Sequence, residues 1–242
     1  MNGARRVGGE FLGSAGLAAV VVGSGIAAQQ LSPTDTGLQL LENAIATALG
    51  LTVLILVFAP ISGAQFNPVV SLVDAALGGR PWRDLLAYAP AQLIGCIAGT
   101  ALANVMFEQP AVAWSQTDRV SPAHLLSEVV ATAGLVLVIF ALVRTNRSAF
   151  VAPAVGAYIG AAYFFTSSTS FANPAITIGR TFTDTFAGIS PGSVAPFIVA
   201  QCIGALIGWA AVHAFFPVAR TASARARGLE LERPAILRPS AD

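Results

Sequence analysis

The sequence contains no lysine, and only 10% of its 242 residues are charged. In soluble domains about a quarter of the residues are charged, so this composition excludes an ordinary soluble domain. The net charge is +1, which excludes the basic surface typical of a nucleic-acid-binding protein. Hydrophobic residues make up 55% of the chain, and this proportion indicates a protein of the lipid bilayer.

Cysteine and histidine are also scarce, with two residues of each. Cys96 and Cys202 lie in apolar stretches, and we interpret them as buried small hydrophobic residues. The sequence shows no residues at metal-ligand spacing and no nucleophile–base pair. We therefore expect no metal, no cofactor and no enzymatic activity.

The apolar residues form runs long enough to cross a bilayer, which takes roughly 20 residues per helix. Six such runs lie at about 8–29, 41–59, 82–107, 123–144, 149–167 and 194–217. Two shorter runs begin at Asn67 and Asn173, and their length fits half-helices that enter the membrane without crossing it. The sequence thus predicts an all-α membrane protein with six transmembrane helices and two re-entrant half-helices.

The arginines predict the orientation of these spans. Only Arg119 and Arg180 fall on one side of the six-span arrangement, and all other arginines fall on the side of the two termini. By the positive-inside rule, both termini are cytoplasmic. We expect a channel domain over 1–217 and a flexible cytoplasmic tail over 218–242.

An internal repeat divides the channel domain into about 8–107 and about 123–217. Segment 10–17 matches 128–135, the motif at Asn67 matches the motif at Asn173, and segment 91–95 matches 200–204, in the same order. Each half has three spans, an odd number, so the halves insert with opposite topology. Inverted repeats with a broken helix in each half point to a site near the midplane of the membrane.

The two motifs are Asn67-Pro68-Val69 and Asn173-Pro174-Ala175. Asparagine is a good N-cap, and proline at the first helical position loses no hydrogen bond. Two half-helices entering from opposite faces bring their partly positive N-termini together at mid-membrane. The asparagine amides and the carbonyl groups of 63–66 and 168–172 would then line a pore that passes neutral hydroxylated molecules and repels cations.

The segments around these motifs, 62–70 and 171–177, resemble the two signature loops of the aquaporin and aquaglyceroporin (major intrinsic protein) family. The resemblance covers about 8–217 and implies the fold described above, usually as a homotetramer. Glu10 and Glu128 match the buried glutamates of that family, which accept hydrogen bonds from the backbone of the re-entrant loops. A proton relay is the alternative role for these two carboxylates.

The chain departs from the family pattern at the narrow outer filter. The family's filter arginine is replaced by Ile176, and the other three filter positions map onto Thr47, Ala161 and Ser170 by their spacing from the asparagines. None of the four is aromatic or charged, so we predict a wide filter with few donors and no strict selectivity for water. The segment 173–189 resembles a bacterial subgroup that lacks this arginine and is associated with arsenic resistance. The resemblance therefore implies a bacterial inner-membrane channel for water, glycerol and arsenous acid.

Arg180 lies one helical turn after Ile176. Its guanidinium either reaches the outer vestibule and partly replaces the missing filter charge, or it pairs with Asp184 or extends to the outer surface. We expect proton exclusion to be largely retained in both cases, because the half-helix dipoles remain.

Three other functions stay open at the level of the sequence. A water-preferring aquaporin is the first alternative. A secondary active transporter also uses inverted repeats and broken helices, but no unpaired carboxylate near the Asn-Pro motifs is available to couple an ion. A structural membrane protein with a closed pore would require an occluding side chain, for which Phe164, Phe165 and Phe171 are candidates.

Overall fold

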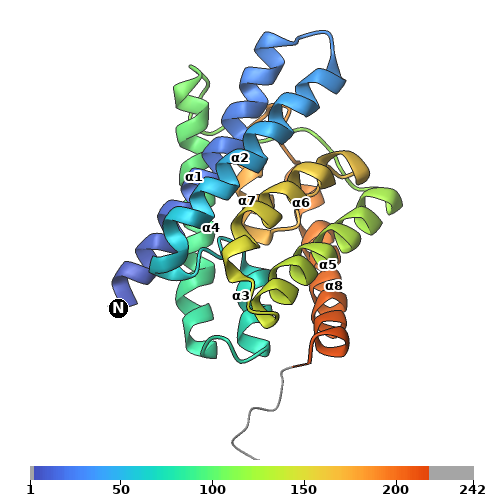
Figure 1. The fold of residues 1–242 in the computed structure, drawn as a ribbon. Helices are drawn as coiled ribbons and strands as arrows, with labels where there is room; N and C mark the ends of the chain where they lie inside the picture. The colour runs from blue at the N-terminus through green and yellow to red at the C-terminus, as the bar shows by residue number, and fades with distance from the viewer. Residues whose placement is uncertain (1–2, 218–242) are drawn as a thin grey trace, which may run out of the picture.

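Figure 1 shows the helices of the protein in a computed structural model, which describes residues 3–217. Within these residues six helices are long and apolar enough to cross a membrane, which confirms the predicted fold class. They are α1 (Gly3–Leu31), α2 (Thr36–Ser62), α4 (Trp82–Met106), α5 (Pro122–Arg144), α6 (Val151–Phe165, preceded by the 3-10 turn Ser148–Phe150) and α8 (Pro191–Phe215). The tail predicted at 218–242 lies outside the described residues.

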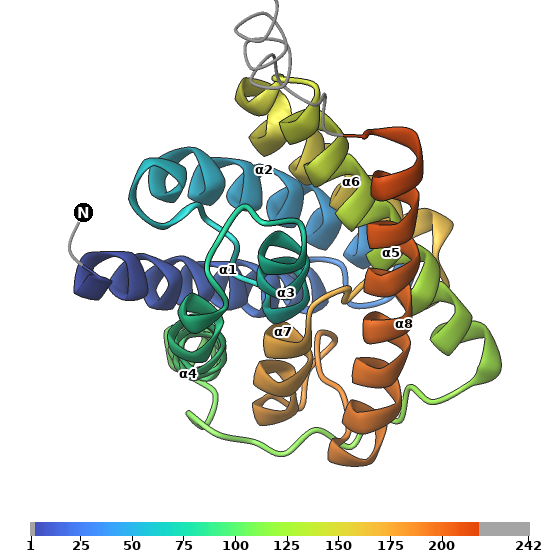
Figure 2. The same cartoon turned by 90° about the horizontal axis from the view of Figure 1, so that it is seen from below.

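Two short helices lie among the long ones. They are α3 (Pro68–Ala76) and α7 (Pro174–Gly179), and a 3-10 turn (Arg180–Phe182) follows the second. Both contact α4 and α8, and they also contact each other. In the view of Figure 2, α3 and α7 are enclosed by α1, α4 and α8. The two predicted half-helices are therefore present, and both stay inside the bundle.

The two halves of the chain use the same order of elements, since α1 to α4 correspond to α5 to α8. Helix α1 packs along α4, and α5 packs along α8 in the same way. Both ends of the described chain lie on one side of the molecule, at the bottom of Figure 1. We call this side the terminal face, and we call the opposite side, with loops 32–35, 107–121 and 183–190, the distal face.

The outward sides of the long helices are apolar, whereas the interior contains charged and amide side chains. On α2, for example, Ile45, Leu49 and Val53 are between 52% and 65% exposed. Inside the bundle, Glu10 and Glu128 are completely buried. This inverts the pattern of a soluble protein, and it fits helices that face hydrocarbon outside and enclose a polar path.

Small residues allow the paired helices to approach closely. A β-carbon at Gly204 of α8 would lie 2.4 Å from the carbonyl oxygen of Val129 in α5. In the other half, a β-carbon at Gly95 of α4 would lie 2.4 Å from the carbonyl oxygen of Phe11 in α1. Because backbone cannot move aside cheaply, neither position accepts a side chain without separating the helices.

We expect Gly204→Ala to destabilise the bundle by about 1–3 kcal/mol, the usual cost of overpacking. The midpoint of thermal unfolding in detergent should fall by roughly 5 °C. Gly192→Ala, in the first turn of the same helix, is the matched control, because nothing lies within 4 Å of a β-carbon there. Equal midpoints for the two variants would contradict the close packing of α5 and α8.

Candidate functional site

A cavity of about 240 Å³ runs between the half-helices and the long helices. Its lining begins with Asp74 and Arg80 near the terminal face, passes Asn67 and Asn173, and ends with Arg180 near the distal face. The cavity is therefore elongated along the direction in which the six long helices run. One wall, formed by α2, α5 and α6, is apolar and includes the side chains Leu51, Ile55, Leu135, Ile139 and Val155.

Each asparagine of the two motifs caps the half-helix that follows it. The Asn67 Oδ1 atom accepts a hydrogen bond from the backbone N–H of Val69, at 3.1 Å. The Asn173 Oδ1 atom accepts one from the backbone N–H of Ala175, at 2.9 Å. Both asparagines have extended backbones, as N-caps require. The acceptor side of each amide is thus occupied by its own half-helix.

The donor sides of the two amides connect the two loops. Asn67 Nδ2 donates to the carbonyl oxygen of Ala172 at 2.7 Å, and Asn173 Nδ2 donates to that of Phe66 at 2.8 Å. An asparagine NH₂ group has two hydrogens, so each amide keeps one further N–H. Since both residues line the cavity, this second hydrogen is available to a solute oxygen.

The loops before the asparagines adopt an unusual backbone that is the same in both halves. The residues three and one before each asparagine have left-handed φ values, between 47° and 54°; they are Ala64, Phe66, Ser170 and Ala172. Such φ values cost about 1–3 kcal/mol for a residue other than glycine. The surrounding hydrogen bonds must therefore hold the loops in place.

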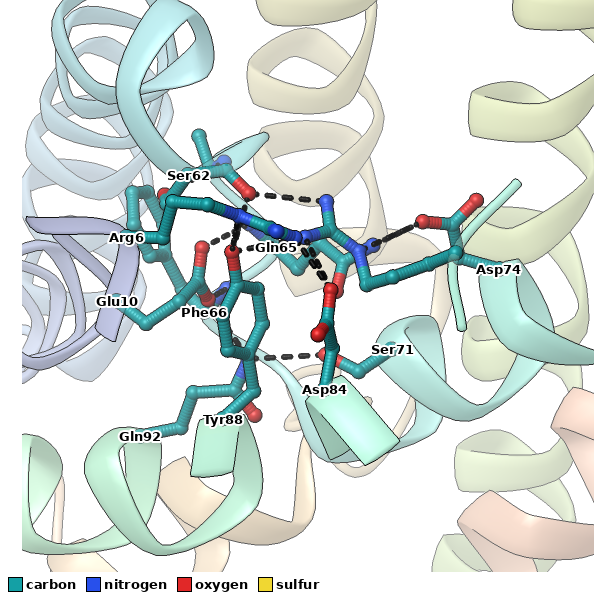
Figure 3. Close-up of polar contacts among 12 residues, drawn as sticks. Arg6, Glu10, Ser62, Gln65, Phe66, Ser71, Asp74, Asp84, Tyr88 and Gln92 are labelled. Atoms are coloured by element: carbon teal, nitrogen blue, oxygen red, sulfur yellow. Dashed lines mark hydrogen bonds and ion pairs between the residues drawn. The ribbon is translucent and has the colours of Figure 1, made fainter. Parts of the chain in front are cut away.

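Glu10 supplies these bonds in the first half (Figure 3). Its carboxylate accepts from the backbone N–H groups of Gln65 and Phe66, at 3.1 and 2.8 Å, and from Gln92 Nε2, at 2.7 Å. The Gln92 amide also donates to Ser71 Oγ in α3 at 3.0 Å. One buried carboxylate thus connects α1 and α4 to the re-entrant loop.

Glu128 has the corresponding position in the second half. It accepts from the backbone N–H groups of Phe171 and Ala172, at 2.9 and 2.8 Å, and from Ser168 Oγ and Gln201 Nε2, both at 2.7 Å. Every described polar contact of this carboxylate is therefore with the loop or with its support. This geometry favours the loop-supporting role over a proton relay.

The sequence analysis gave no role to the glutamines in these two networks. Gln92 and Gln201 are completely buried, and each bridges a glutamate to a hydroxyl group of a half-helix. Their place in the repeated segments 91–95 and 200–204 was one signal in the sequence. A buried amide in an otherwise apolar span is the feature that could have identified them.

The filter positions are only partly where their spacing placed them. Thr47, Ser170 and Ile176 line the cavity, but Ala161 is exposed on the outer side of α6, so its assignment is wrong. Successive residues of a helix are about 100° apart, and Ala161 is two residues away from the positions that face the cavity. Those positions are Ile159 and Tyr163.

Tyr163 consequently adds an aromatic side chain to a filter that was predicted to have none. Its hydroxyl lies 3.1 Å from Thr47 Oγ1, so α2 and α6 are joined by a hydrogen bond at the cavity wall. The side chain is 3% exposed. This end of the cavity is therefore lined by a larger side chain and by more hydroxyl groups than the sequence indicated.

Arg180 lines the distal end of the cavity and is 3% exposed, so it does not extend to the outer surface. Its Nε atom donates to the carbonyl oxygen of Ala187, and its Cζ atom lies 3.6 Å from the centre of the Phe171 ring. Asp184 instead accepts from the backbone N–H of Gln116, and no ion pair with Arg180 occurs within residues 3–217. The pairing alternative is therefore wrong.

A second arginine, Arg119, lies on the distal side of the Phe171 ring. Arg119 donates to the carbonyl oxygens of Gly188 and Phe186, at 2.7 and 2.9 Å, and its Cζ atom lies 5.4 Å from the Phe171 ring centre. Burial lowers the pKa of the Arg119 guanidinium below its usual value. Arg119 also lines an open hollow of about 580 Å³ in the distal face, which we call the vestibule.

A polar cluster at the other end of the cavity was not predicted (Figure 3). Arg80 donates to Asp74 at 3.1 Å, to the Tyr88 hydroxyl at 2.8 Å and to the carbonyl oxygen of Ser62 at 2.9 Å; Figure 3 labels these three partners. Gln65 donates to the same Asp74 carboxylate at 2.6 Å. Because Asp74 is neutralised by Arg80 here, this end carries an ion pair in place of a free charge.

The chain is similar in sequence to known membrane channels. The family model described as Major intrinsic protein matches residues 1–170. The chain is 51% identical over 202 residues to a protein named aquaglyceroporin AqpS of Rhizobium meliloti, covering 84% of this chain and 86% of that protein. It is 34% identical over 182 residues to Aquaporin Z of Brucella melitensis, covering 68% and 78%.

Two further relatives extend the comparison. A protein named glycerol uptake facilitator of Streptococcus pneumoniae is 33% identical over 148 residues, covering 55% of this chain and 62% of that protein. In three dimensions, the structure of the aquaglyceroporin from Plasmodium falciparum superposes with a TM-score of 0.67 at 22% identity, covering 88% and 96%. At that identity the superposition supports the fold alone.

Proposed function

Because the chain belongs to the major intrinsic protein family, a family of membrane channels and not of enzymes, we propose that it conducts glycerol, arsenous acid and water by passive diffusion. The observation that carries the proposal is the two-sided cavity. One wall is a row of aliphatic side chains, and the other presents the two asparagine amides and the loop backbone. A small polyhydroxylated solute matches both walls, since its oxygens find donors and its remaining surface contacts the apolar wall.

The uncharged character of the solute follows from the centre of the cavity. Two half-helix N-termini meet there, and each contributes roughly half a positive charge. The remaining amide hydrogens of Asn67 and Asn173 are donors, so these two side chains offer a cation no ligand. Proton exclusion is part of the same proposal. Arsenous acid is included because it is neutral and hydroxylated at neutral pH, and because the relatives named above include an aquaglyceroporin.

Stopped-flow measurement of purified protein in liposomes tests the proposal. Water, glycerol and arsenous acid are compared with empty vesicles, and a pH-sensitive dye reports proton flux. We expect all three solutes to cross faster than in empty vesicles, with little proton flux. Absence of any increase would refute the channel proposal, and strict dependence on a proton gradient would indicate an active transporter.

A water-preferring pore is the second candidate, because Tyr163 and Thr47 narrow the distal end of the cavity. Fast water with neither larger solute would support this candidate. Tyr163→Ala should then admit glycerol, because it removes the aromatic ring through which α6 contacts Thr47 of α2 at the cavity wall. Unchanged glycerol exclusion in that variant would show that Tyr163 does not set the width of the pore.

The orientation, the location and the assembly are proposals as well. Toward the terminal face, Arg5, Arg6 and Arg144 lie at the ends of α1 and α5, and Arg80 and Arg147 lie in the loops after α3 and α5; Arg119 and Arg180 lie toward the distal face. By the positive-inside rule, the terminal face is cytoplasmic in a bacterial inner membrane. Labelling of single cysteines in intact cells tests the orientation, and native mass spectrometry tests the proposed homotetramer.

A further inference from the structure

Arg180 has a position that the proposed function does not explain. A buried guanidinium is costly in a membrane unless it has partners, and such residues are commonly functional. Its Nε atom is used by Ala187. For its two terminal nitrogens, no hydrogen bond to any of residues 3–217 is found, and neither nitrogen is sealed from the cavity that the residue lines. A strong donor group therefore faces the pore without a partner within the described chain.

We propose that the Arg180 guanidinium is the solute-binding and cation-repelling group of the distal constriction, in place of an arginine at position 176. The inference rests on the proposed channel function and names the residue that sets its selectivity. Helical side chains point back toward the N-terminus of their helix, so Arg180 leans over the preceding turn, where Ile176 lies. Arg180 thus supplies the positive charge and the hydrogen-bond donors that Ile176 lacks, from one turn further along the chain.

Neighbouring groups complete a binding site around the guanidinium. Ser170 lines the same cavity, but its Oγ atom is covered by other atoms and has no hydrogen-bond partner within residues 3–217. The hydroxyl groups of Thr47 and Tyr163 lie on the opposite wall, paired with each other. A solute with several hydroxyl groups can accept from Arg180 and exchange a hydrogen bond with the Tyr163 hydroxyl. A monovalent cation would meet a fixed positive charge.

Within residues 3–217, no carboxylate forms an ion pair with Arg180. The ion pairs of the described chain, Arg6–Asp84, Arg80–Asp74 and Arg80–Asp84, all lie toward the terminal face. Glu128 makes its hydrogen bonds to the loop and its support and none to Arg180, and Arg119 adds a second positive charge on the distal side of Phe171. The stacking on Phe171 holds the guanidinium plane in place without neutralising it.

The test compares Arg180→Met, Arg180→Lys and wild type in liposomes, with Arg147→Met on the exposed terminal face as matched control. Loss of a charged donor should lower glycerol flux about tenfold in Arg180→Met. Sodium leak should rise by a similar factor, and water flux should not fall. Arg180→Lys should keep the leak low while glycerol flux still drops, because lysine retains the charge and not the planar donor fork. Unchanged leak and glycerol flux in a folded Arg180→Met protein would overturn the proposal.

Chemical restoration of the charge covers the case in which Arg180→Met does not fold. Arg180→Cys is combined with Cys202→Ala, which removes the exposed native thiol, while Cys96 is buried. A positively charged methanethiosulfonate should suppress the sodium leak of this protein, and a neutral one of similar size should not. Equal effects of both reagents would indicate a steric role and refute the electrostatic one. If the wild-type protein conducts no solute, the proposed channel function fails. If the wild-type protein conducts and the Arg180 variants conduct equally, only the proposal for Arg180 fails.

Discussion

Replacing Glu128 by glutamine is expected to lower solute flux at least about tenfold and to reduce the yield of folded protein. The carboxylate accepts four hydrogen bonds, two on each oxygen. Glutamine keeps one acceptor oxygen and places an NH₂ group where the other oxygen was. The Ser168 hydroxyl and the Gln201 amide can turn around to accept from it. The backbone N–H groups of Phe171 and Ala172 can only donate. The one that faces the new NH₂ group is therefore left buried and unsatisfied.

An unsatisfied buried N–H costs about 1–3 kcal/mol, and the loop has further strain to release. Thr169, Ser170 and Ala172 hold φ values of 62°, 54° and 47°, which glycine alone adopts freely. Without its full set of bonds to Glu128, the loop relaxes toward ordinary φ values. Because Asn173 follows directly, its amide then moves away from the cavity and from the carbonyl of Phe66.

Stopped-flow glycerol permeability and thermal unfolding in detergent are the measurements for this variant. Glu108→Gln is the matched control, because Glu108 is an exposed carboxylate in the distal loop. Glu10→Gln should have a smaller effect, because its new NH₂ group can face the backbone N–H of Gln65, which is only part-buried, whereas both backbone donors to Glu128 are buried. Wild-type flux in Glu128→Gln would contradict the loop-supporting role, and a selective loss of proton flux alone would revive the relay alternative.

Much of the fold was predictable because lipid imposes simple rules on a sequence. The six spans follow from the length of apolar runs, and their observed ends differ from the expected ones by a few residues. The half-helices were predictable from Asn67-Pro68 and Asn173-Pro174, since the cap and the proline act locally. The inverted repeat then implied that the two motifs meet, and this is what the cross-loop bonds of the two asparagines show.

The site was predictable only where the sequence fixes the position of a side chain. Thr47, Ser170 and Ile176 lie at the cavity, but the residue on α6 depends on how that helix is rotated about its axis, and spacing from a distant motif does not determine this. Tyr163 faces inward because the row Val155, Ile159 and Tyr163 repeats every four residues. The exposed side of α6 is apolar as well, so hydrophobicity alone cannot distinguish its two sides in a membrane.

The contacts of long polar side chains were the other feature that the sequence did not predict. The contact partners of Arg80 and Arg180 include backbone carbonyl groups that neither charge nor helical spacing indicates, namely those of Ser62 at the end of α2 and Ala187 in the loop after α7. Charge and spacing suggested Asp184 as a partner for Arg180. The structure shows a carbonyl and an aromatic ring in its place, because the chain after α7 turns back over the half-helix.

Asn173→Asp is expected to produce the largest change in selectivity, with glycerol flux reduced at least about tenfold and a cation leak that wild type does not have. The carboxylate can still cap α7, since its oxygens accept from the N–H groups of Ala175 and Ile176, and a negative charge is favourable at a helix N-terminus. The half-helix should therefore remain. What is lost is every donor of the side chain, including the bond to Phe66 and the hydrogen available to a solute.

The sign of the charge at the centre of the pore decides between the outcomes. The two half-helix ends contribute roughly one positive charge together, so an added carboxylate cancels it and offers a cation its first ligand. Asn173→Leu is the informative comparison, because it removes the donors and the cap without adding charge. It should lose glycerol flux and stability but gain no sodium leak. Sodium leak in both variants would mean that the cavity has merely widened. Leak in the aspartate variant alone would show that the half-helix dipoles and the asparagine amides form a barrier to cations at the centre of the pore, in addition to the one proposed at Arg180.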